Sequence, residues 1–594
     1  MSEPKFTRSM FRTLLSGDYS GLLPLIHFEN EQSHLFLNGR IYNEMAENLL
    51  PDFINRGKDA LKAIDGDFLL VIIHSGKLYF FRDRHGAGKQ LFYTRDFFTT
   101  QLTDFISLPG FKCKPDLEAL FTFLSIGYIP SPQTSLEGVQ KLPGGHLLEF
   151  DNGTITVSDL FDYQDFQLTT GTLKMSVTEA AAEYERLHKQ SIESRIKDAR
   201  KVGLLLSGGY DSGGNISALR DLYDGDVVSY SIGFKDNPWT ELPLAAILSE
   251  KYRSKHFEYE IDGSEIMDLP LIISALGDPF QEGGLMLNYS AMRLVKESNE
   301  HPQIILGGDG NDQHFGTSGK ELALHWKFRK NGLQKFQKIF DMAGNNSLFE
   351  KDNLFFRTQF HNRKILHIQQ SDTFGFTRNR LNKLNCISLK VPEFQYLKNS
   401  PESYADFNEF YRCRNYFIDI KQVINEVILF KASKMADMFS NTISFPYMST
   451  GLYQFLKQLP VDYKFYGTFD DLSKGKGKSK YLHKLYLKPK LPSEITDRKK
   501  QGGFAPLPIF LRNSEQRAQI FRIIEQSDAI KALFKKEMIH QFLQQYEKVA
   551  GSPGYWFWYK QVKANQVINL TTLVVWWDIF IGGKKHIQSL TDLL

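Results

Sequence analysis

The amino-terminal part of the chain alternates short apolar runs with turn-forming residues. Residues 68–73 and 77–81 are continuous apolar runs around Ser75-Gly76, a pair typical of a β-hairpin turn. Because polar residues do not alternate with apolar ones in these runs, we expect both faces of the hairpin to be covered. Further strands are predicted at residues 35–37 and 147–150. This region is therefore expected to be β-rich.

A long helix is predicted to follow a polar stretch near residues 161–175. Ser176 and Glu179 have the spacing of a helix capping box. Apolar residues then recur at helical period, at Val177, Ala181, Tyr184, Leu187 and Ile192. We therefore predict a domain boundary here, with one domain at residues 1–170 and the other at 171–594.

From residue 202 the pattern changes to a strand, a glycine-rich loop and a helix. Residues 202–206 are apolar without polar alternation, as in a buried parallel strand, and lead into the loop at 207–212. Further strands are predicted at 227–233 and 303–306, and a further helix at 244–252. This alternation predicts a doubly wound parallel α/β sheet, which binds ligands at the carboxyl ends of its strands. Beyond about residue 320 the chain is predicted to be mostly helical.

Composition limits the classes of protein that fit. The 594 residues are 42% hydrophobic and 24% charged, which is typical of a soluble globular protein, and the net charge of +4 gives no indication of nucleic-acid binding. Cys113, Cys386 and Cys413 are too scattered for a disulfide framework, which favours a reducing, cytoplasmic location. No signal peptide is apparent, and the apolar stretch at 570–581 is too short for a membrane span.

The loop at 207–212, Ser-Gly-Gly-Tyr-Asp-Ser, is the strongest chemical signal. Two glycines after a strand let backbone N–H groups approach an anion, and the following helix adds its positive N-terminal dipole. Ser207 and Ser212 offer hydroxyl donors, and Asp211 offers a hard oxygen ligand for Mg²⁺. An ordinary turn with Asp211 or Ser212 as the helix N-cap is the simpler alternative. The whole string is rare enough to favour phosphate binding.

This string resembles the pyrophosphate-binding loop of the ATP pyrophosphatase enzymes, and specifically of the asparagine synthetase family. The resemblance implies ATP and Mg²⁺ as cofactors, and cleavage between the α- and β-phosphates to form an acyl-adenylate. The nucleotide-binding residues that it implies are Leu206, Ser207, Gly208, Gly209, Asp211, Ser212, Ile232 and Gly308. Ile232 belongs to a segment whose family counterpart lies against adenine, although a plain buried strand explains this segment equally well.

Two further segments acquire roles through the same resemblance. Residues 307–313 are most simply a turn, but they match a family segment in which Asp312 would be the second Mg²⁺ ligand beside Asp211. Asp309 matches an acidic residue near the reacting centre, and Gln313 stands where the family usually has glutamate.

The second of these segments, at 498–506, contains a basic triplet that alone indicates only a solvated surface. The resemblance implies that Lys500 enters the site and stabilises developing negative charge. The lysine-rich run at 474–480 is most simply a solvated loop, or else it closes over the triphosphate or an acidic peptide.

The amino-terminal region resembles the glutaminase domain of the same family at residues 38–43, 82–86 and 141–146, so we expect a degenerate Ntn-type sandwich. A working glutaminase needs a cysteine directly after the initiator methionine, where this sequence has Ser2. Arg40 also replaces a family glutamate. We therefore expect that the protein does not hydrolyse glutamine.

These features together predict an ATP-dependent ligase that closes an intramolecular amide. The family's charged stretch is replaced by Lys434-Met435-Ala436 and an uncharged run at 439–444, which argues against a pocket for free aspartate. Among the branches without the cysteine, the lasso peptide cyclases resemble the chain more than the β-lactam synthetases, which have a tyrosine at the position of Asp309. A precursor peptide substrate is then implied, with a leader-peptide protease and a leader-binding protein as further partners. An ammonia-dependent asparagine synthetase and an inactive peptide-binding scaffold are the alternatives.

Overall fold

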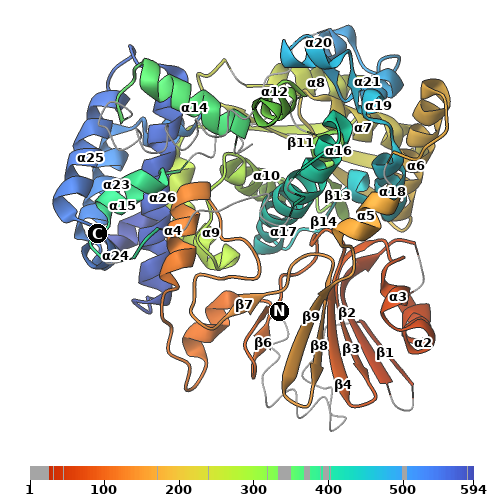
Figure 1. The fold of residues 1–594 in the computed structure, drawn as a ribbon, viewed down its shortest axis with the longest axis horizontal. Helices are drawn as coiled ribbons and strands as arrows, with labels where there is room; N and C mark the ends of the chain where they lie inside the picture. The colour runs from red at the N-terminus through yellow and green to blue at the C-terminus, as the bar shows by residue number, and fades with distance from the viewer. Residues whose placement is uncertain are drawn as a thin grey trace.

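The computed structural model places a β-rich amino-terminal domain below a larger α/β domain with additional helices (Figure 1). The structure describes residues 26–594 except 31–32, 44–45, 170, 239, 317–318, 332–349, 367–374, 388, 392–399, 402, 498–504 and 585. Within these residues, the smaller domain holds the antiparallel sheets and the larger one holds the parallel sheet.

The amino-terminal domain is built on a six-stranded antiparallel sheet in the order β1-β2-β3-β4-β8-β9. A smaller three-stranded sheet has the order β6-β5-β7. The strands are β1 (Ile26–Asn30), β2 (Ser33–Ile41), β3 (Gly66–His74), β4 (Lys77–Arg82), β5 (Phe92–Tyr93), β6 (Phe98–Thr99), β7 (Gln140–Lys141), β8 (His146–Asp151) and β9 (Thr154–Asp159). The helices are α2 (Ala46–Arg56), α3 (Lys58–Leu61), η2 (Leu102–Ser107), α4 (Leu117–Ile126) and α5 (Tyr163–Thr169).

The predicted hairpin is confirmed as β3 and β4. Ser75 and Gly76 both have positive φ angles, 52° and 75°, which suits a tight turn that follows the right-handed twist of the strands. Successive residues of β3 are buried in two different apolar clusters, so both faces of the hairpin are covered as predicted. One cluster takes Leu69, Val71 and Ile73, and the other takes Phe68, Leu70 and Ile72.

The larger domain contains a five-stranded parallel sheet in the order β12-β11-β10-β13-β14. Its strands are β10 (Lys201–Leu205), β11 (Asp226–Phe234), β12 (Lys255–Ile261), β13 (Ile304–Leu306) and β14 (Ile443–Ser444). The strand order reverses between β10 and β13, so the carboxyl ends of these two strands border the switch point of a doubly wound sheet. This confirms the predicted fold class and places any ligand site at that edge.

Helices surround this sheet. α6 (Val177–Ile196) begins at Ser176, whose capping box with Glu179 is present as predicted. The other helices up to residue 366 are α7 (Tyr210–Leu222), α8 (Leu242–Lys251), η3 (Ser264–Asp268), α9 (Leu269–Leu276), α10 (Leu285–Glu297), α11 (Asn311–Phe315), α12 (Gly319–Lys330) and α14 (Leu354–Leu366).

The rest of the larger domain is mostly helical, as predicted. A continuous helical stretch runs through α16 (Phe407–Arg414), the π-helical η5 (Asn415–Ile428) and α17 (Leu429–Met438). A small sheet pairs β15 (Phe465–Tyr466) with β16 (Lys478–Ser479). The remaining helices are α15 (Arg378–Leu384), η6 (Pro446–Met448), α18 (Thr450–Gln458), α19 (Val461–Lys464), α20 (Phe469–Ser473), α21 (Tyr481–Leu487), α22 (Ser493–Thr496), η7 (Leu507–Leu511), α23 (Ser514–Gln526), α24 (Asp528–Leu533), α25 (Lys536–Ala550), α26 (Phe557–Phe580) and η8 (Leu590–Leu593).

One apolar core joins the two domains. The helix α4 lies beside α26 and contributes Leu120, Phe121 and Leu124 to a cluster that also contains Leu570 and Leu573 of α26 (Figure 1). The same cluster reaches the parallel sheet through Val228 and Ile305 and includes Leu102 and Phe105 of η2. The amino-terminal domain is thus packed into the core of the larger domain.

Candidate functional site

The loop between β10 and α7 is held by hydrogen bonds of its own residues. The Ser207 N–H donates to Ser212 Oγ at 3.0 Å, Ser212 Oγ donates to the Ser207 carbonyl at 3.0 Å, and the Gly209 N–H donates to Ser207 Oγ at 3.2 Å. Gly208 packs so closely on α8 that a Cβ there would lie 2.4 Å from Leu244 Cβ. The loop therefore has a fixed conformation at the start of α7, where the helix dipole favours an anion.

The loop after β13 lies against the first loop. Gly310 has a φ of 95°, and a Cβ at this position would lie 2.0 Å from Met448 Sδ, so only glycine fits the turn into α11. Asn311 Nδ2 donates to Asp211 Oδ1 at 2.7 Å, and Asn215 Nδ2 donates to the Gly307 carbonyl at 3.0 Å. These bonds hold the ends of β10 and β13 together.

Asp211 and Asp312 converge on one cationic group, the ammonium of Lys480. Lys480 Nζ lies 2.5 Å from Asp211 Oδ2 and 2.7 Å from Asp312 Oδ1, and only 6% of the lysine side chain is exposed. Two carboxylates that both contact one small cation can also share a metal ion. The geometry thus fits the pair of Mg²⁺ ligands that was predicted at Asp211 and Asp312.

The prediction that residues 474–480 form a solvated loop is wrong for the last of these lysines. Lys474, Lys476 and Lys478 are exposed, but Lys480 is buried. Its φ of 53° turns the chain from β16 into α21 and directs the side chain inward. The two aspartates supply the negative charge that makes burial of this ammonium tolerable.

Several buried polar side chains form a layer next to Asp211. His483 Nε2 lies 3.2 Å from Asp211 Oδ1, and His483 Nδ1 lies 3.0 Å from the Tyr184 hydroxyl. The Tyr184 hydroxyl donates to Asn311 Oδ1 at 3.0 Å, and the Tyr447 hydroxyl donates to the Asp211 carbonyl at 2.8 Å. Burial lowers the pKa of His483, and the Asp211 carboxylate partly opposes this shift. Within this layer, Tyr184 bonds Asn311, which in turn donates to the Asp211 carboxylate, so the layer fixes Asp211 through Asn311 and through the backbone carbonyl.

Asp309 lies close to the two aspartates and to a third carboxylate, Glu282. Burial raises the pKa of Asp309 to about 6, while the nearby Lys431 ammonium lowers it and Glu282 raises it. Lys431 forms a buried ion pair with Glu282, whose carboxylate also accepts the Gly284 N–H at 2.8 Å. A carboxylate with a pKa near neutrality can exchange a proton with a substrate amine.

The remaining predicted residues are distributed around this edge. Leu206 is buried at the end of β10, where its N–H donates to the Tyr230 carbonyl at 2.9 Å. Ile232 is half-buried near the end of the neighbouring β11. A Cβ on Gly308 would lie 3.3 Å from the Ser212 nitrogen, so Gly308 brings the second loop against the first. The predicted nucleotide-binding residues thus lie along one edge of the sheet.

Lys500 lies outside the described residues, as does the whole segment 498–504. The chain on each side of this segment contacts the site. The Tyr210 hydroxyl donates to the Thr496 carbonyl at 3.2 Å, and the Ala505 N–H donates to the Gly283 carbonyl at 3.1 Å. The role of Lys500 therefore stays a prediction.

Sequence reasoning missed Lys431, Glu282 and His483 as site residues and misplaced Lys480. Lys480 was visible only as one member of a lysine-rich run. Lys431 and Glu282 carry no local motif, and their ion pair joins positions 149 residues apart. The helix α17 also contains Lys434 and Asp437, so Lys431 did not stand out from its neighbours in the sequence.

The motifs retained in the amino-terminal domain serve its fold. Arg82 is buried and donates to Gln90 Oε1 at 2.7 Å, while Asp83 accepts the N–H groups of Ala87 and Gly88 at 3.0 and 2.7 Å. Arg40 donates to the Gln303 carbonyl at 3.4 Å, toward the larger domain. The three cysteines of the sequence, Cys113, Cys386 and Cys413, lie outside the strands of both amino-terminal sheets.

Comparison with known proteins agrees with this architecture. The family model described as asparagine synthase matches residues 183–577, and the model described as glutamine amidotransferase domain matches residues 43–161. The "Asparagine synthetase [glutamine-hydrolyzing] 1" of Bacillus subtilis (strain 168) is 23% identical over 575 residues, which cover 89% of this chain and 85% of that protein.

Two further proteins match a smaller part of this chain. A Mycobacterium tuberculosis (strain H37Rv) relative, whose description also names an asparagine synthetase, is 23% identical over 81% of this chain and 76% of its own length. A solved glutamine phosphoribosylpyrophosphate amidotransferase from B. subtilis aligns over 48% of this chain and 58% of that chain at 11% identity, with a TM-score of 0.16. That score is too low to support an argument about the fold.

Fold and site together define an α/β protein with a glutaminase-like amino-terminal domain and a parallel-sheet synthetase domain. Since the asparagine synthase model matches more than half of the chain, the protein belongs to the asparagine synthase family of ATP-dependent amide ligases. Within the part of the chain that the structure describes, none of the helices combines the length and the apolarity needed to cross a membrane.

Proposed function

We propose that this protein activates a carboxylate with ATP and then closes an intramolecular amide within a peptide, forming the macrolactam ring of a lasso peptide. The observation that carries the ligase proposal is the convergence of Asp211 and Asp312 on one cation at the switch point of the sheet. In this proposal, ATP lies along the loops after β10 and β13. The precursor peptide is the substrate, and a leader-peptide protease and a leader-binding protein act with the enzyme.

In the first half of the reaction, several residues of the chain would bind the triphosphate and its metal ion. Asp211 and Asp312 would hold Mg²⁺, which neutralises phosphate charge when bound. The N–H groups of the 207–212 loop bind the pyrophosphate that leaves when the substrate carboxylate attacks the α-phosphate. Lys480, displaced from the two aspartates, remains close enough to bind phosphate oxygens. Each of these groups favours formation of the acyl-adenylate.

The second half of the reaction uses Asp309. The substrate amine attacks the acyl carbon, AMP leaves with the electrons of the broken acyl–phosphate bond, and Asp309 accepts the amine proton. A pKa of about 6 keeps Asp309 ionised at neutral pH while leaving it a useful base. Lys431 and Glu282 position this carboxylate, and Lys500 is proposed to stabilise the oxyanion.

An internal amine is favoured over ammonia because the amino-terminal domain offers no thiol placed for glutamine hydrolysis. The cysteines of the chain are Cys113, which packs against the shared apolar core, and Cys386 and Cys413 of the larger domain. Of the two lysines of α17, Lys431 is paired with Glu282 near Asp309, and Lys434 donates to the Thr100 carbonyl at 3.4 Å. Neither lysine is positioned to bind the α-carboxylate of free aspartate.

The second candidate function is an ammonia-dependent asparagine synthetase, which the similarity to the B. subtilis enzyme favours. An ATP–pyrophosphate exchange assay distinguishes the candidates. Exchange stimulated by a precursor peptide, together with a peptide product that has lost one water, supports the macrolactam proposal. Exchange stimulated by aspartate, with asparagine formed from ammonium, supports the second candidate. If no carboxylate stimulates ATP–pyrophosphate exchange, the result supports the remaining alternative, an inactive peptide-binding scaffold.

A further inference from the structure

We propose that His27, Glu29 and His34 bind one zinc ion on the outer sheet of the amino-terminal domain. These side chains form the one group of metal-ligating residues found within 4.8 Å of one another among the described residues. The group lies on the β1–β2 hairpin, far from the candidate active site, and it belongs to no motif that the proposed function uses. The inference is therefore independent of that function.

The register of the hairpin places all three side chains on one face of the sheet. His27 and Glu29 are two residues apart on β1, so both point to the same side. Glu29 is directly opposite His34 on β2, and His27 is directly opposite Phe36. Cross-strand neighbours share a face, so the backbone pairing alone brings the two imidazoles and the carboxylate together.

The distances between the ligand atoms match those around a tetrahedral zinc ion. With zinc–ligand distances of about 2.0–2.1 Å, two tetrahedral ligand atoms lie about 3.4 Å apart. His27 Nε2 lies 3.3 Å from His34 Nδ1, and Glu29 Oε2 lies 3.3 Å from His34 Nδ1 and 3.7 Å from His27 Nε2. The three atoms thus form one face of a tetrahedron, and a fourth ligand would complete the coordination.

The surroundings restrict the imidazole rings to this arrangement. The His27 ring stacks on Phe36, with ring centroids 4.4 Å apart and an angle of 5° between the planes. Phe36 belongs to the apolar cluster on this face of the sheet, so the ligands lie at the margin of a core. The His34 side chain is only 18% exposed. A partly dehydrated, pre-oriented set of two imidazoles and one carboxylate favours zinc over the hard cations Mg²⁺ and Ca²⁺.

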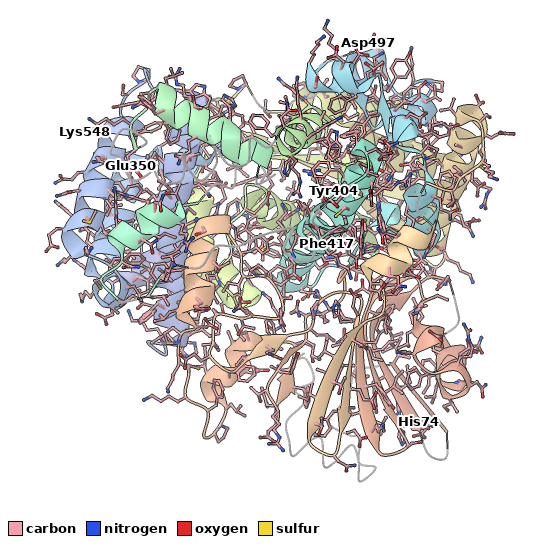
Figure 2. All side chains as sticks on the ribbon, in the orientation of Figure 1. His74, Glu350, Tyr404, Phe417, Asp497 and Lys548 are labelled. Carbon is pink, nitrogen blue, oxygen red and sulfur yellow. The ribbon has the colours of Figure 1, made fainter. Side chains whose placement is uncertain are left out.

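A metal at this position would link the edge strand β1 to β2. The hairpin lies toward the outer end of the sheet, close to His74, whose Nδ1 lies 2.7 Å from the Oγ of Ser33 at the start of β2. Figure 2 labels His74 at the end of the molecule opposite Asp497, which lies next to the synthetase site. The expected role is structural, because three protein ligands on one hairpin pin the outermost strand to its neighbour.

Cobalt binding to the full chain tests this proposal. The protein is prepared without a polyhistidine tag, freed of metal and titrated with Co²⁺ in excess Mg²⁺, which occupies carboxylate sites that prefer hard cations. We expect one equivalent of Co²⁺ to give the strong visible absorption of tetrahedral coordination, and one equivalent of Zn²⁺ to abolish it. His34→Ala and Glu29→Gln should weaken binding at least about tenfold each.

His256→Ala is the matched control. His256 also pairs with a glutamate two residues along the same strand, Glu258, but this pair does not belong to a group of three metal-ligating residues among those that the structure describes. This variant should bind Co²⁺ as the wild type does. The proposal is overturned if the wild type gives no tetrahedral spectrum, or if the spectrum survives in the His27→Ala/His34→Ala variant. Zn²⁺ should also raise the melting temperature of the wild type and leave that of the double variant unchanged.

Discussion

Lys480 Nζ lies 2.5 Å from Asp211 Oδ2, in the position where a divalent cation is expected when nucleotide is bound. The lysine and the metal therefore compete for the same carboxylates. Lys480→Met should tighten Mn²⁺ binding to the nucleotide-free protein by about tenfold or more, because two carboxylates would lose their compensating charge. Titration followed by electron paramagnetic resonance measures this affinity.

The exposed Lys478, two residues earlier, provides the control for this experiment. Lys478→Met should leave Mn²⁺ affinity unchanged. Equal Mn²⁺ affinity in wild type and Lys480→Met would contradict a shared cation position.

The two aspartates should be required for nucleotide chemistry. Asp211→Asn and Asp312→Asn should each slow ATP–pyrophosphate exchange by at least about a hundredfold, because each removes a ligand for the metal on the leaving group. Asp470→Asn, at an exposed aspartate of α20, should retain exchange. Exchange at the wild-type rate in both site variants would show that the triphosphate binds elsewhere.

The rate of amide formation should depend on the ionisation of Asp309. Its raised pKa of about 6 means that the carboxyl becomes protonated as the pH falls below 6 and can no longer accept the amine proton. We expect kcat/KM to fall about tenfold for each pH unit below 6 and to level off above it. Asp309→Asn should lower the plateau and remove this dependence.

Asp67 is a matched control for that profile, because burial also raises its pKa to about 6. Its carboxylate accepts hydrogen bonds from Tyr42 and Ser444 at the domain interface, at 2.9 and 2.6 Å. Asp67→Asn should preserve the acid limb. A limb that disappears in Asp67→Asn and persists in Asp309→Asn would assign the titration to the interface.

Stability should fall in mild acid because of His188. Burial lowers the pKa of His188 to about 3, whereas the unfolded chain takes up the proton near the ordinary value of 6.5. As the pH falls, His188 is therefore protonated in the unfolded state before it is protonated in the folded state. The contribution of this histidine to the free energy of unfolding is complete above about pH 6.5 and is lost progressively toward pH 3. Between pH 7 and 5 this histidine should cost about 2 kcal/mol.

Urea unfolding at the two pH values measures this loss. His188→Gln should reduce the difference by about that amount, while His540→Gln, at an exposed histidine, should leave it intact. An unchanged difference in His188→Gln would mean that other groups dominate acid unfolding.

A buried ion pair joins the two domains, and breaking it should destabilise the protein. Lys141 Nζ lies 2.7 Å from Asp278 Oδ2, and the side chains are only 7% and 4% exposed. Asp278 Oδ1 also accepts the N–H and hydroxyl of Ser135 at 2.8 and 2.7 Å. Lys141→Met should cost about 3–5 kcal/mol of unfolding free energy, because it strands a buried carboxylate.

Thermal and urea unfolding test this prediction against Lys531→Met, which breaks an exposed ion pair with Asp528 and should change little. Lys141→Met/Asp278→Asn should recover part of the lost stability, since no charge then remains buried. A single variant as stable as the wild type would show that the ion pair contributes nothing.

Much of the parallel sheet could be predicted from the sequence because its signals are local. β10, the loop at 207–212 and α7 are contiguous, so one apolar run and one motif identify them. β12 was missed although its apolar residues alternate with polar ones, a pattern typical of a half-buried strand at a sheet edge. β14 has only two residues and thus no periodicity to detect.

The site was predictable only where its residues share a motif. Asp211, Asp309 and Asp312 follow strands directly, so their meeting at one edge follows from the topology of the fold. Lys480 reaches Asp211 across 269 residues, and no spacing rule specifies a contact over that distance. Its position depends on the left-handed backbone at residue 480, which a non-glycine residue adopts only under tertiary constraint.

The apolar cluster that α4 and α26 share makes the amino-terminal domain part of the core of the larger domain. Deleting this domain would expose Leu570 and Leu573 to water and leave the synthetase helices without a partner. A truncated chain that begins at the helix α6 should therefore aggregate rather than yield a minimal enzyme, however intact its catalytic aspartates are.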